Sequence, residues 1–399
     1  MKGCGIVAEY NPFHNGHRFH IEETRRAGAT HIVAVMSGNF VQRAEPAVIS
    51  KFDRARLAIL GGADLVIELP VQYAVSSSER FARGAVALLE ALGCVDEISF
   101  GSEAGNIASL RAAAKAVSDK DVIELTRQFY ETGMSYPAAR ENVVEKLYGK
   151  DISEVLRTSN NILGVEYIKA LDELKSKIEP ITFRREGASH DSDESEGGFA
   201  SARMLREEVR RGADIINYVP FETKLAMETA ASEGKLSGGL DALSQAILFS
   251  LRTMSREELS ELPDCGDGLG SRIYNAAAES GDMGEIFDIA KTKRYTMSRV
   301  RRAAIYALLG IDASYFFSPP YIRIMAIGRN AQELLNRIGK THTLPMSVSL
   351  KELSKQGENA FKTAKLEAHA TDIFNLSIYK PASRGRDYTV PVFKEDAAI

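Results

Sequence analysis

Residues 4–17, CGIVAEYNPFHNGH, join a short apolar run to two histidines that flank Asn15 and Gly16. Runs such as CGIVAE (4–9), short and rich in small and β-branched side chains, are typical of buried parallel strands. The segment that follows, residues 17–27, is long enough for a helix. Doubly wound folds bind ligands at the turn between such a strand and such a helix, so this stretch predicts both a sheet and a ligand site.

The same alternation of strand and helix continues through the first half of the chain. Helices are expected at 50–60 and 78–92, between further apolar runs. Those runs are HIVAVM (31–36), DLVIEL (64–69), VDEISF (95–100) and ITF (181–183). Strands that alternate with crossover helices predict an α/β fold with a doubly wound parallel sheet.

The rest of the chain is expected to be mostly helical. A chain of 399 residues exceeds one compact core, which favours roughly two or three domains. We expect a helical insertion at about 106–175 and a boundary near residue 215, where strand-like runs nearly cease. The predicted domains are 1–215, built on the sheet, and 216–399, mostly helical, with helices at about 239–252, 270–279, 297–309 and 329–338.

Composition and charge restrict the cellular compartment and the kinds of binding partner that we expect for this protein. The formal net charge is -4, so a polyanionic partner must meet a local basic patch. The cysteines, Cys4, Cys94 and Cys265, show neither a pairing nor a zinc spacing. The chain reaches Glu9 too early for a signal peptide, and no apolar run approaches the about 18 residues of a membrane span. We therefore expect a cytoplasmic protein with no membrane partner and no evident obligate protein partner.

His14 and His17 lie where a phosphate would meet the start of a helix. Gly16 allows close backbone approach, and amides at a helix N-terminus attract phosphate. The two imidazoles can donate hydrogen bonds to phosphate oxygens, and such donors accelerate attack at an α-phosphate if they bind more strongly as charge develops. Alternatively, one or both histidines only cap the helix or complete the turn.

A second phosphate-binding element is expected in GGFASARMLREEVRRG, residues 197–212. Ser201 could cap its helix and Arg206 could clamp phosphate oxygens, whereas the alternative is an ordinary amphipathic helix with a serine cap. Asn39 and Gln42 fall in a polar loop at the ligand edge of the sheet. They form a plausible wall for a small cosubstrate, but as loop residues they could equally be solvated.

Three further stretches flank the predicted cleft. EISFGSEAG places Gly101 just past a strand end, where a side chain would block a ligand. TSNNILGVEYIKAL opens a helix at Asn160 and Asn161, whose amides could bind a nucleotide. FRREG places Arg184 and Arg185 at the same edge of the sheet. Taken alone, each stretch favours a structural role.

A basic stretch, KTKRYTMSRVRRAAIYALLGI, occupies residues 291–311. Helical periodicity places apolar residues on one face and Arg299, Arg302 and Tyr306 on another. Basic and aromatic side chains on one exposed face suit single-stranded RNA, and a solvated charged face is the alternative. The candidate RNA-binding residues are Lys291, Lys293, Arg294, Arg299, Arg301 and Arg302.

Together these motifs resemble a known family. HNGH is similar to the HIGH signature of nucleotidyltransferases and of one class of aminoacyl-tRNA synthetases. In order along the chain, GIVAEYNPFHNGH, SGNFVQRxEPA, GADLVIELP, SNNILGxEYIKAL, FASxxxLR and KRYTMSRxRR resemble the bacterial tRNA(Met) cytidine acetate ligases. The similarity spans nearly the whole chain.

The resemblance implies a nucleotidyltransferase-like Rossmann domain and a two-step reaction. ATP and acetate would form acetyl-adenylate and pyrophosphate, and the acetyl group would pass to N4 of the wobble cytidine in elongator tRNA(Met). Mg²⁺ would accompany ATP, and no metal-ligating residues of the protein are predicted.

Within this reaction we assign the candidate residues to roles. The catalytic candidates are His14, His17 and Arg206, and the acetate candidates are Asn39 and Gln42. Together with Ser201, the stretches that the resemblance implies give the ATP-binding set of Val7, Ala8, Glu9, Tyr10, Asn11, Pro12, Phe13, His14, Asn15, Gly16, His17, Arg18, Phe19, His20, Gly101, Asn161, Arg185 and Glu186.

Two rival functions share parts of this pattern. A small-molecule adenylyltransferase acting on a phosphorylated metabolite would share HNGH and the sheet, but the long segment after residue 215 argues against it. A non-catalytic RNA-binding protein on a degenerate nucleotide fold would not need His14, Gly16 and His17 intact.

The chain also departs from the family pattern at two places. Arg203 stands where a threonine is usual, and Ser189-His190-Asp191 replaces a Gly-Tyr-His-Asp run after Gly187. Both departures affect the expected contacts with the triphosphate more than the expected activity.

Overall fold

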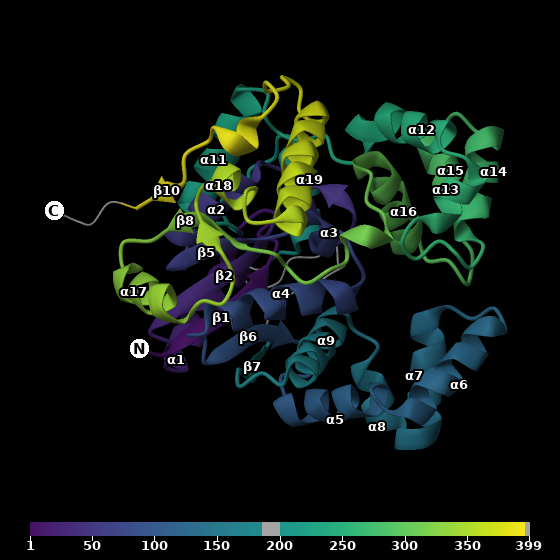
Figure 1. The fold of residues 1–399 in the computed structure, drawn as a ribbon, viewed down its shortest axis with the longest axis horizontal. Coiled ribbons are helices and arrows are strands. Elements are labelled where there is room, and N and C mark those ends of the chain that lie inside the picture. The colour runs from purple at the N-terminus through teal and green to yellow at the C-terminus, as the bar shows by residue number, and fades with distance from the viewer. Residues whose placement is uncertain (186–199, 396–399) are drawn as a thin grey trace.

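The computed structural model describes residues 1–185 and 200–395, which form one large sheet with helices on both faces (Figure 1) and a separate two-stranded hairpin. The sheet strands are β1 (Gly3–Ala8), β2 (His31–Ser37), β5 (Leu65–Leu69), β6 (Glu97–Ser102), β7 (Glu179–Arg184), β8 (Ile322–Ile327) and β10 (Phe393–Lys394). They run in the order β10-β8-β5-β2-β1-β6-β7, and β9 (Met346–Ser347) pairs with β8. The predicted strands are confirmed, and the five strands from β5 to β7 in this order are parallel.

The strand order changes direction at β1. β2 pairs with one side of β1 and β6 with the other, so that Gly5 lies between Val33 and Ile98. In doubly wound sheets the ligand crevice opens at the carboxyl ends of the strands beside such a switch point. The turn after Ala8 and the end of β6 therefore flank the expected crevice.

Both faces of the sheet are buried. In β2, Val33 and Val35 belong to one core and Ile32 and Ala34 to another, and all four are inaccessible to solvent. This explains why HIVAVM is apolar at successive positions. The covering helices are α1 (Asn15–Arg26), α2 (Lys51–Leu60), α3 (Val71–Ala74), α4 (Ser78–Leu92), α5 (Ile107–Val117), α9 (Ser159–Leu174), α10 (Ala202–Arg210), α11 (Phe221–Ser232) and α17 (Gln332–Thr341).

Two groups of helices extend from the sheet on the same side in Figure 1. The first follows β6 and adds α6 (Lys120–Glu131), α7 (Tyr136–Tyr148) and α8 (Lys150–Val155), as expected for a helical insertion. The second packs around an apolar core that contains Ile247, Leu269 and Ile286 and that extends to residues of the sheet domain such as Phe40 and Val71. Its helices are α12 (Ser244–Thr253), α13 (Arg256–Glu261), α14 (Leu269–Glu279), α15 (Met283–Ala290) and α16 (Met297–Leu309).

The end of the chain differs from the expected helical domain because it returns to the sheet. β8 pairs antiparallel with β5, with Leu65 opposite Ile327. Arg323 interrupts the apolar run of β8, and its guanidinium is buried, so the sequence pattern hides the strand. The remaining elements are η1 (Asp241–Leu243), η2 (Ala313–Tyr315), α18 (Leu350–Leu353), α19 (Glu358–Phe374), η3 (Asn375–Ser377) and η4 (Arg386–Tyr388).

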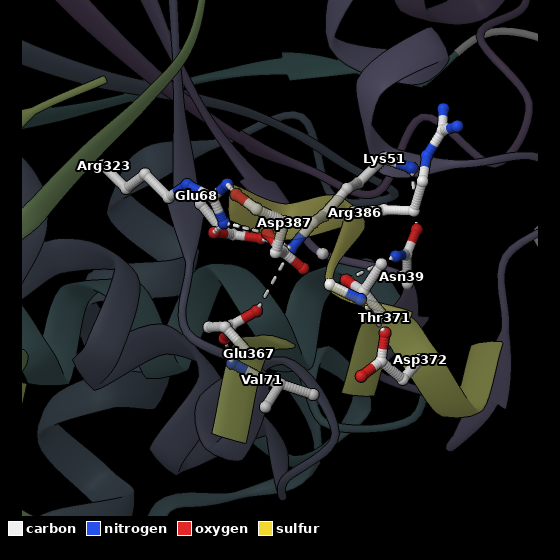
Figure 2. A network of polar contacts seen from close by, with 12 residues as sticks. Asn39, Lys51, Glu68, Val71, Arg323, Glu367, Thr371, Asp372, Arg386 and Asp387 are labelled. Carbon is white, nitrogen blue, oxygen red and sulfur yellow. Dashed lines mark hydrogen bonds and ion pairs between the residues drawn. The ribbon is translucent and has the colours of Figure 1, made fainter. Parts of the chain in front are cut away.

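A buried ionic network ties these C-terminal elements to the sheet (Figure 2). Nζ of Lys51 lies 2.6 Å from Glu68 and 2.9 Å from Asp387, and Arg323 lies 2.8 Å from Glu68. Burial, together with the charge of Glu68, raises the pKa of Glu367 well above its usual range. A neutral Glu367 leaves two cations facing two carboxylates, so the network is balanced in charge.

Candidate active site

The turn between β1 and α1 holds both histidines at the start of the helix. His14 is the N-cap, and its Nδ1 accepts a hydrogen bond from the backbone N–H of Gly16 at 3.1 Å. Nδ1 of His17 accepts one from the backbone N–H of His14 at 3.2 Å, and the two rings stack with their centroids 3.7 Å apart. Both histidines therefore take part in capping, which the sequence left open.

The caps determine which ring nitrogen carries the proton. A neutral imidazole that accepts at Nδ1 carries its hydrogen at Nε2. His14 and His17 thus combine a capping acceptor with a hydrogen-bond donor, so the two roles that the sequence presented as alternatives are compatible. Both rings line a pocket at the carboxyl ends of β1 and β6.

Most of the predicted ATP-binding residues line this pocket. Among the described residues they are Val7, Ala8, Glu9, Tyr10, Asn11, His14, His17, His20, Gly101, Arg185 and Ser201. Seven predicted residues in the described ranges are absent from its lining: Pro12, Phe13, Asn15, Gly16, Arg18, Phe19 and Asn161. Phe13 is fully buried in the core below α1, and Glu186 lies outside the described residues.

The pocket has an apolar wall that the sequence pattern did not predict. This wall consists of Phe81, Phe100, Leu163 and Tyr167. Aromatic and aliphatic side chains of this kind suit a flat base. Leu163 and Tyr167 are four residues apart on α9, which places them on one face, but an apolar residue in a helix is more often part of the core.

Gly101 lies within β6, where it pairs with Phe183, and the prediction that it follows the strand end was wrong. A Cβ at this position would lie 3.0 Å from Cγ of Arg185. The missing side chain therefore makes room for the arginine that follows β7, whose side chain lines the pocket. Burial lowers the pKa of this guanidinium.

Glu103 positions the start of α9 beside the pocket. Its carboxylate accepts hydrogen bonds from Nδ2 of Asn160 at 2.7 Å and from the backbone N–H of Asn161 at 2.9 Å. Oδ1 of Asn161 accepts from the backbone N–H of Ala104 at 3.0 Å. Of the two predicted asparagines, Asn160 lines the pocket and Asn161 does not.

The predicted second phosphate element is a capped helix. Ser201 is the N-cap of α10 and accepts from the backbone N–H of Met204 at 3.1 Å. Arg206 is buried, donates to the carbonyl oxygen of Asn11 at 3.0 Å and pairs with Glu45 at 2.9 Å. These contacts hold the guanidinium next to the histidine turn, and its contact with phosphate stays a prediction.

The two acetate candidates have different surroundings. Oδ1 of Asn39 accepts from the backbone N–H of Lys51 at 2.8 Å, and its Nδ2 donates to Thr371 at 2.9 Å, so its side chain serves the buried network (Figure 2). Gln42 lines the pocket, and its backbone N–H donates to Glu9 at 2.9 Å. Both belong to the loop that carries β3 (Phe40–Val41) and β4 (Glu45–Pro46).

The basic stretch is divided among three environments. Lys291 and Lys293 are exposed, and Arg301 lines a second cavity. Arg299 donates to the hydroxyl of Tyr130 at 2.7 Å and to Asp267 at 2.8 Å, which joins α16 to the helical insertion. Arg294 lies over the ring of Tyr130, and Arg302 is 4.0 Å from Asp264.

The predicted exposed face of Arg299, Arg302 and Tyr306 is therefore wrong. Tyr306 is fully buried in the helical core, and both arginines are largely covered by the contacts described above. Of the predicted set, Lys291 and Lys293 are exposed and Arg301 lines the second cavity, and their contact with RNA stays a prediction.

A sheet of this order with an H-N-G-H turn at its switch point defines a nucleotidyltransferase of the HIGH class. In agreement, the family described as HIGH Nucleotidyl Transferase matches residues 1–388. The tRNA(Met) cytidine acetate ligase of Caldanaerobacter subterraneus subsp. tengcongensis is 38% identical over 99% of this chain and 100% of the relative. That of Thermoanaerobacter sp. is 36% identical over 98% of this chain and 99% of the relative. The chain belongs to the tRNA(Met) cytidine acetate ligase family.

Solved structures agree with this assignment. The crystal structure of Thermotoga maritima TmcAL without ligand has a TM-score of 0.92 at 29% identity, over 99% of this chain and 100% of that one. The structure of the same protein bound with alpha-thio ATP has a TM-score of 0.90 at 30% identity, with the same coverage.

Residues 1–185 and 200–395 contain no group of three His, Cys, Asp or Glu side chains arranged to hold a metal ion. No helix in these ranges combines the length and the apolar character that a membrane crossing requires.

Proposed function

We propose that this protein is an ATP-dependent ligase that acetylates N4 of the wobble cytidine of elongator tRNA(Met) with acetate. The observation that carries the proposal is the capped and stacked pair of His14 and His17, which lines the pocket at the switch point. The names of the relatives and the alpha-thio ATP bound by the Thermotoga maritima protein support it.

In the first step a carboxylate oxygen of acetate attacks the α-phosphorus of ATP. A new oxygen–phosphorus bond forms, the bond to pyrophosphate breaks, and acetyl-adenylate remains. Negative charge grows on the phosphate oxygens as this happens, and fixed donors such as His14 and His17 stabilise it without reorganising. Arg206, held by Asn11 and Glu45, would bind the departing pyrophosphate.

Mg²⁺ would enter with the triphosphate, where it neutralises charge on the phosphate oxygens. Since Mg²⁺ usually keeps several waters and binds through substrate phosphates and one or two carboxylates, a dedicated protein cluster is not needed. Among the described residues, Glu9 is the carboxylate that lines the pocket, and it also accepts a hydrogen bond from the backbone N–H of Gln42.

Of the two acetate candidates, Asn39 and Gln42, Gln42 is the better placed because it lines the pocket.

In the second step the N4 amine of cytidine attacks the acetyl carbonyl carbon. A carbon–nitrogen bond forms, the carbon–oxygen bond to AMP breaks, and the amine loses one proton. An acyl-adenylate is already reactive, so orientation of the two reactants supplies most of the help that is needed. The helices beyond residue 215, with Lys291 and Lys293 exposed, would bind the tRNA, and the reaction would take place in the cytoplasm.

Incubation with ATP, labelled acetate and total tRNA tests the proposal. We expect label in N4-acetylcytidine, confined to tRNA(Met), with AMP and pyrophosphate released in equal amounts. An enzyme that uses ATP but leaves no label in any nucleoside would contradict the proposal and favour the small-molecule adenylyltransferase.

A further inference from the structure

A second cavity of about 560 Å³ lies between α10, the β3–β4 hairpin and helices α15 and α16. Its size falls within the range of about 300–1,000 Å³ that small-ligand sites occupy. The cavity is rich in arginine, and its arginines are Arg43, Arg203, Arg206, Arg210 and Arg301. A concentration of guanidinium groups of this kind is suited to phosphate.

Carboxylates are interspersed with these arginines. Glu45 pairs with Arg206 at 2.9 Å, and Glu207 pairs with Arg203 at 3.1 Å. Asp241 and Asp288 also line the cavity. These four carboxylates offset most of the positive charge of the five arginines, and they can accept hydrogen bonds from a nucleotide whose base carries an exocyclic amine.

Apolar side chains complete the lining. They are Leu240, Met283, Phe287 and Met297. A base could pack on such a surface while its phosphate meets the arginines. The cavity therefore offers all three kinds of contact that a ribonucleotide with an exocyclic amine, such as cytidine, requires.

α10 forms a shared wall between this cavity and the ATP pocket. Ser201 and Ala202 line the pocket, and Arg203, Arg206 and Arg210 line the cavity. Arg206 also donates to the carbonyl of Asn11, which lines the pocket. A ligand in the cavity would thus lie beside the place where the acetyl group is activated.

Arg301 has unused hydrogen-bonding capacity at this cavity. Its Nε is buried and has no hydrogen-bond partner among residues 1–185 and 200–395. A buried donor without a partner is costly unless a ligand or water satisfies it. Arg203 and Arg206 are already paired with carboxylates, whereas Arg301 forms no ion pair within the described ranges, so the loss of Arg301 should report most directly on a bound phosphate.

We propose that the cavity between α10 and α15–α16 receives the acceptor nucleotide of the RNA substrate. A backbone phosphate binds at Arg301, the base packs against the apolar lining, and its exocyclic amine meets a carboxylate. This inference rests on the proposed function, because it assigns the place of the RNA in the second step.

The test compares Arg301→Gln with Arg211→Gln. Arg211 is the C-cap residue of α10, its side chain is 71% exposed, and among the ion pairs of the described chain it pairs only with Glu208, so its substitution is a matched loss of one charge outside the cavity. We expect Arg301→Gln to weaken tRNA binding about tenfold and to lower the log–log salt slope by about 1. Acetate-dependent ATP–pyrophosphate exchange, which needs no RNA, is expected to be retained, and Arg301→Lys should recover much of the affinity.

Two results would overturn the inference. Unchanged tRNA affinity and salt slope in Arg301→Gln would exclude a phosphate contact, and a raised KM for ATP in the exchange reaction would assign the cavity to pyrophosphate. If the wild-type protein showed no acetate-dependent exchange, the proposed function would fail, whereas the binding comparison would still decide the role of the cavity.

Cross-linking of the wild-type protein avoids any effect of substitution on folding. Ultraviolet irradiation of the complex with tRNA should attach RNA to peptides of α10 or α15, which line the cavity. Cross-links found only on other segments would contradict the inference.

Discussion

The imidazole rings of His14 and His17 stack at an interplanar angle of 27°, and each accepts a backbone N–H through Nδ1 at the start of α1. The same residues therefore build the helix terminus and supply donors at it. Because a cap requires only an acceptor and catalysis requires a donor, substitutions can separate the two roles.

His14→Asn should remove catalysis while keeping the helix cap. Asparagine is a good N-cap residue, but its side chain lacks the second ring nitrogen. Loss of a charge-stabilising donor typically lowers turnover about 10²–10³-fold, so we expect a loss of that size in acetate-dependent ATP–pyrophosphate exchange. The thermal midpoint should change little, as measured by circular dichroism.

His31→Asn provides the matched control, because His31 begins β2 and is absent from the lining of the described pocket. Wild-type exchange in His14→Asn, with the control also active, would remove this histidine from the mechanism.

His20 should make the folded protein sensitive to acid. Its Nε2 lies 2.8 Å from the hydroxyl of Ser99, and burial, with a smaller effect of Arg185, lowers its pKa to about 4. Between the unfolded value of about 6.5 and this pKa, the unfolded chain binds the extra proton, so stability falls as the pH falls, by up to about 3 kcal/mol. Urea unfolding at a series of pH values should show this loss in the wild type and a smaller one in His20→Gln. Parallel pH profiles for the two proteins would refute the assignment.

Glu367→Gln should be tolerated and should remove an opposite pH dependence. The folded pKa of Glu367 is raised, so its contribution to stability is present at low pH and is lost as the pH rises above about 4.5 and through the folded pKa. The free energy of unfolding of the wild type should therefore fall with rising pH relative to that of the variant. If Glu367→Gln instead lost several kcal/mol at neutral pH, the carboxyl would have to be ionised.

Lys51→Met tests the buried ionic network around Glu367 by removing one of its two cations. Removing one partner of a buried ion cluster leaves charges uncompensated and typically costs about 3–5 kcal/mol. Because Lys51 is buried between Glu68 and Asp387, we expect a loss of this size in chemical denaturation. A loss below about 1 kcal/mol would show that the network contributes little to holding η4 on the sheet.

Charge reversal at Lys291 and Lys293 should weaken tRNA binding without slowing adenylation. Both side chains are exposed, and each phosphate contact adds nearly one unit to the salt slope of binding. The double variant Lys291→Glu, Lys293→Glu should therefore bind tRNA more weakly and with a smaller slope in fluorescence anisotropy. Lys340→Glu with Lys351→Glu, on α17 and α18, is the control, and equal effects of the two pairs would indicate a nonspecific loss of charge.

The parallel strands and the histidine turn could be predicted because their patterns are local. HIVAVM is apolar on both faces since β2 is covered on both faces, and HNGH is short enough to act within one turn. β8 was missed because Arg323 lies within it, and only the distant Glu68 and Asp387 make that burial possible.

The directions in which the side chains of the site point could not be predicted from the sequence. Asn39 and Gln42 are three residues apart, yet one serves Thr371 and the other lines the pocket. Arg299 and Arg301 are two residues apart, but Arg299 contacts Tyr130 and Arg301 lines the second cavity. These partners come from segments far away in the chain, so no local periodicity reveals them.

A crystal structure with a non-hydrolysable ATP analogue tests the central claim most directly. We predict that oxygens of the α-phosphate lie about 2.7–3.2 Å from Nε2 of both His14 and His17, with the base against Leu163 and Tyr167. An α-phosphate bound elsewhere, with both imidazoles turned away from it, would contradict the account.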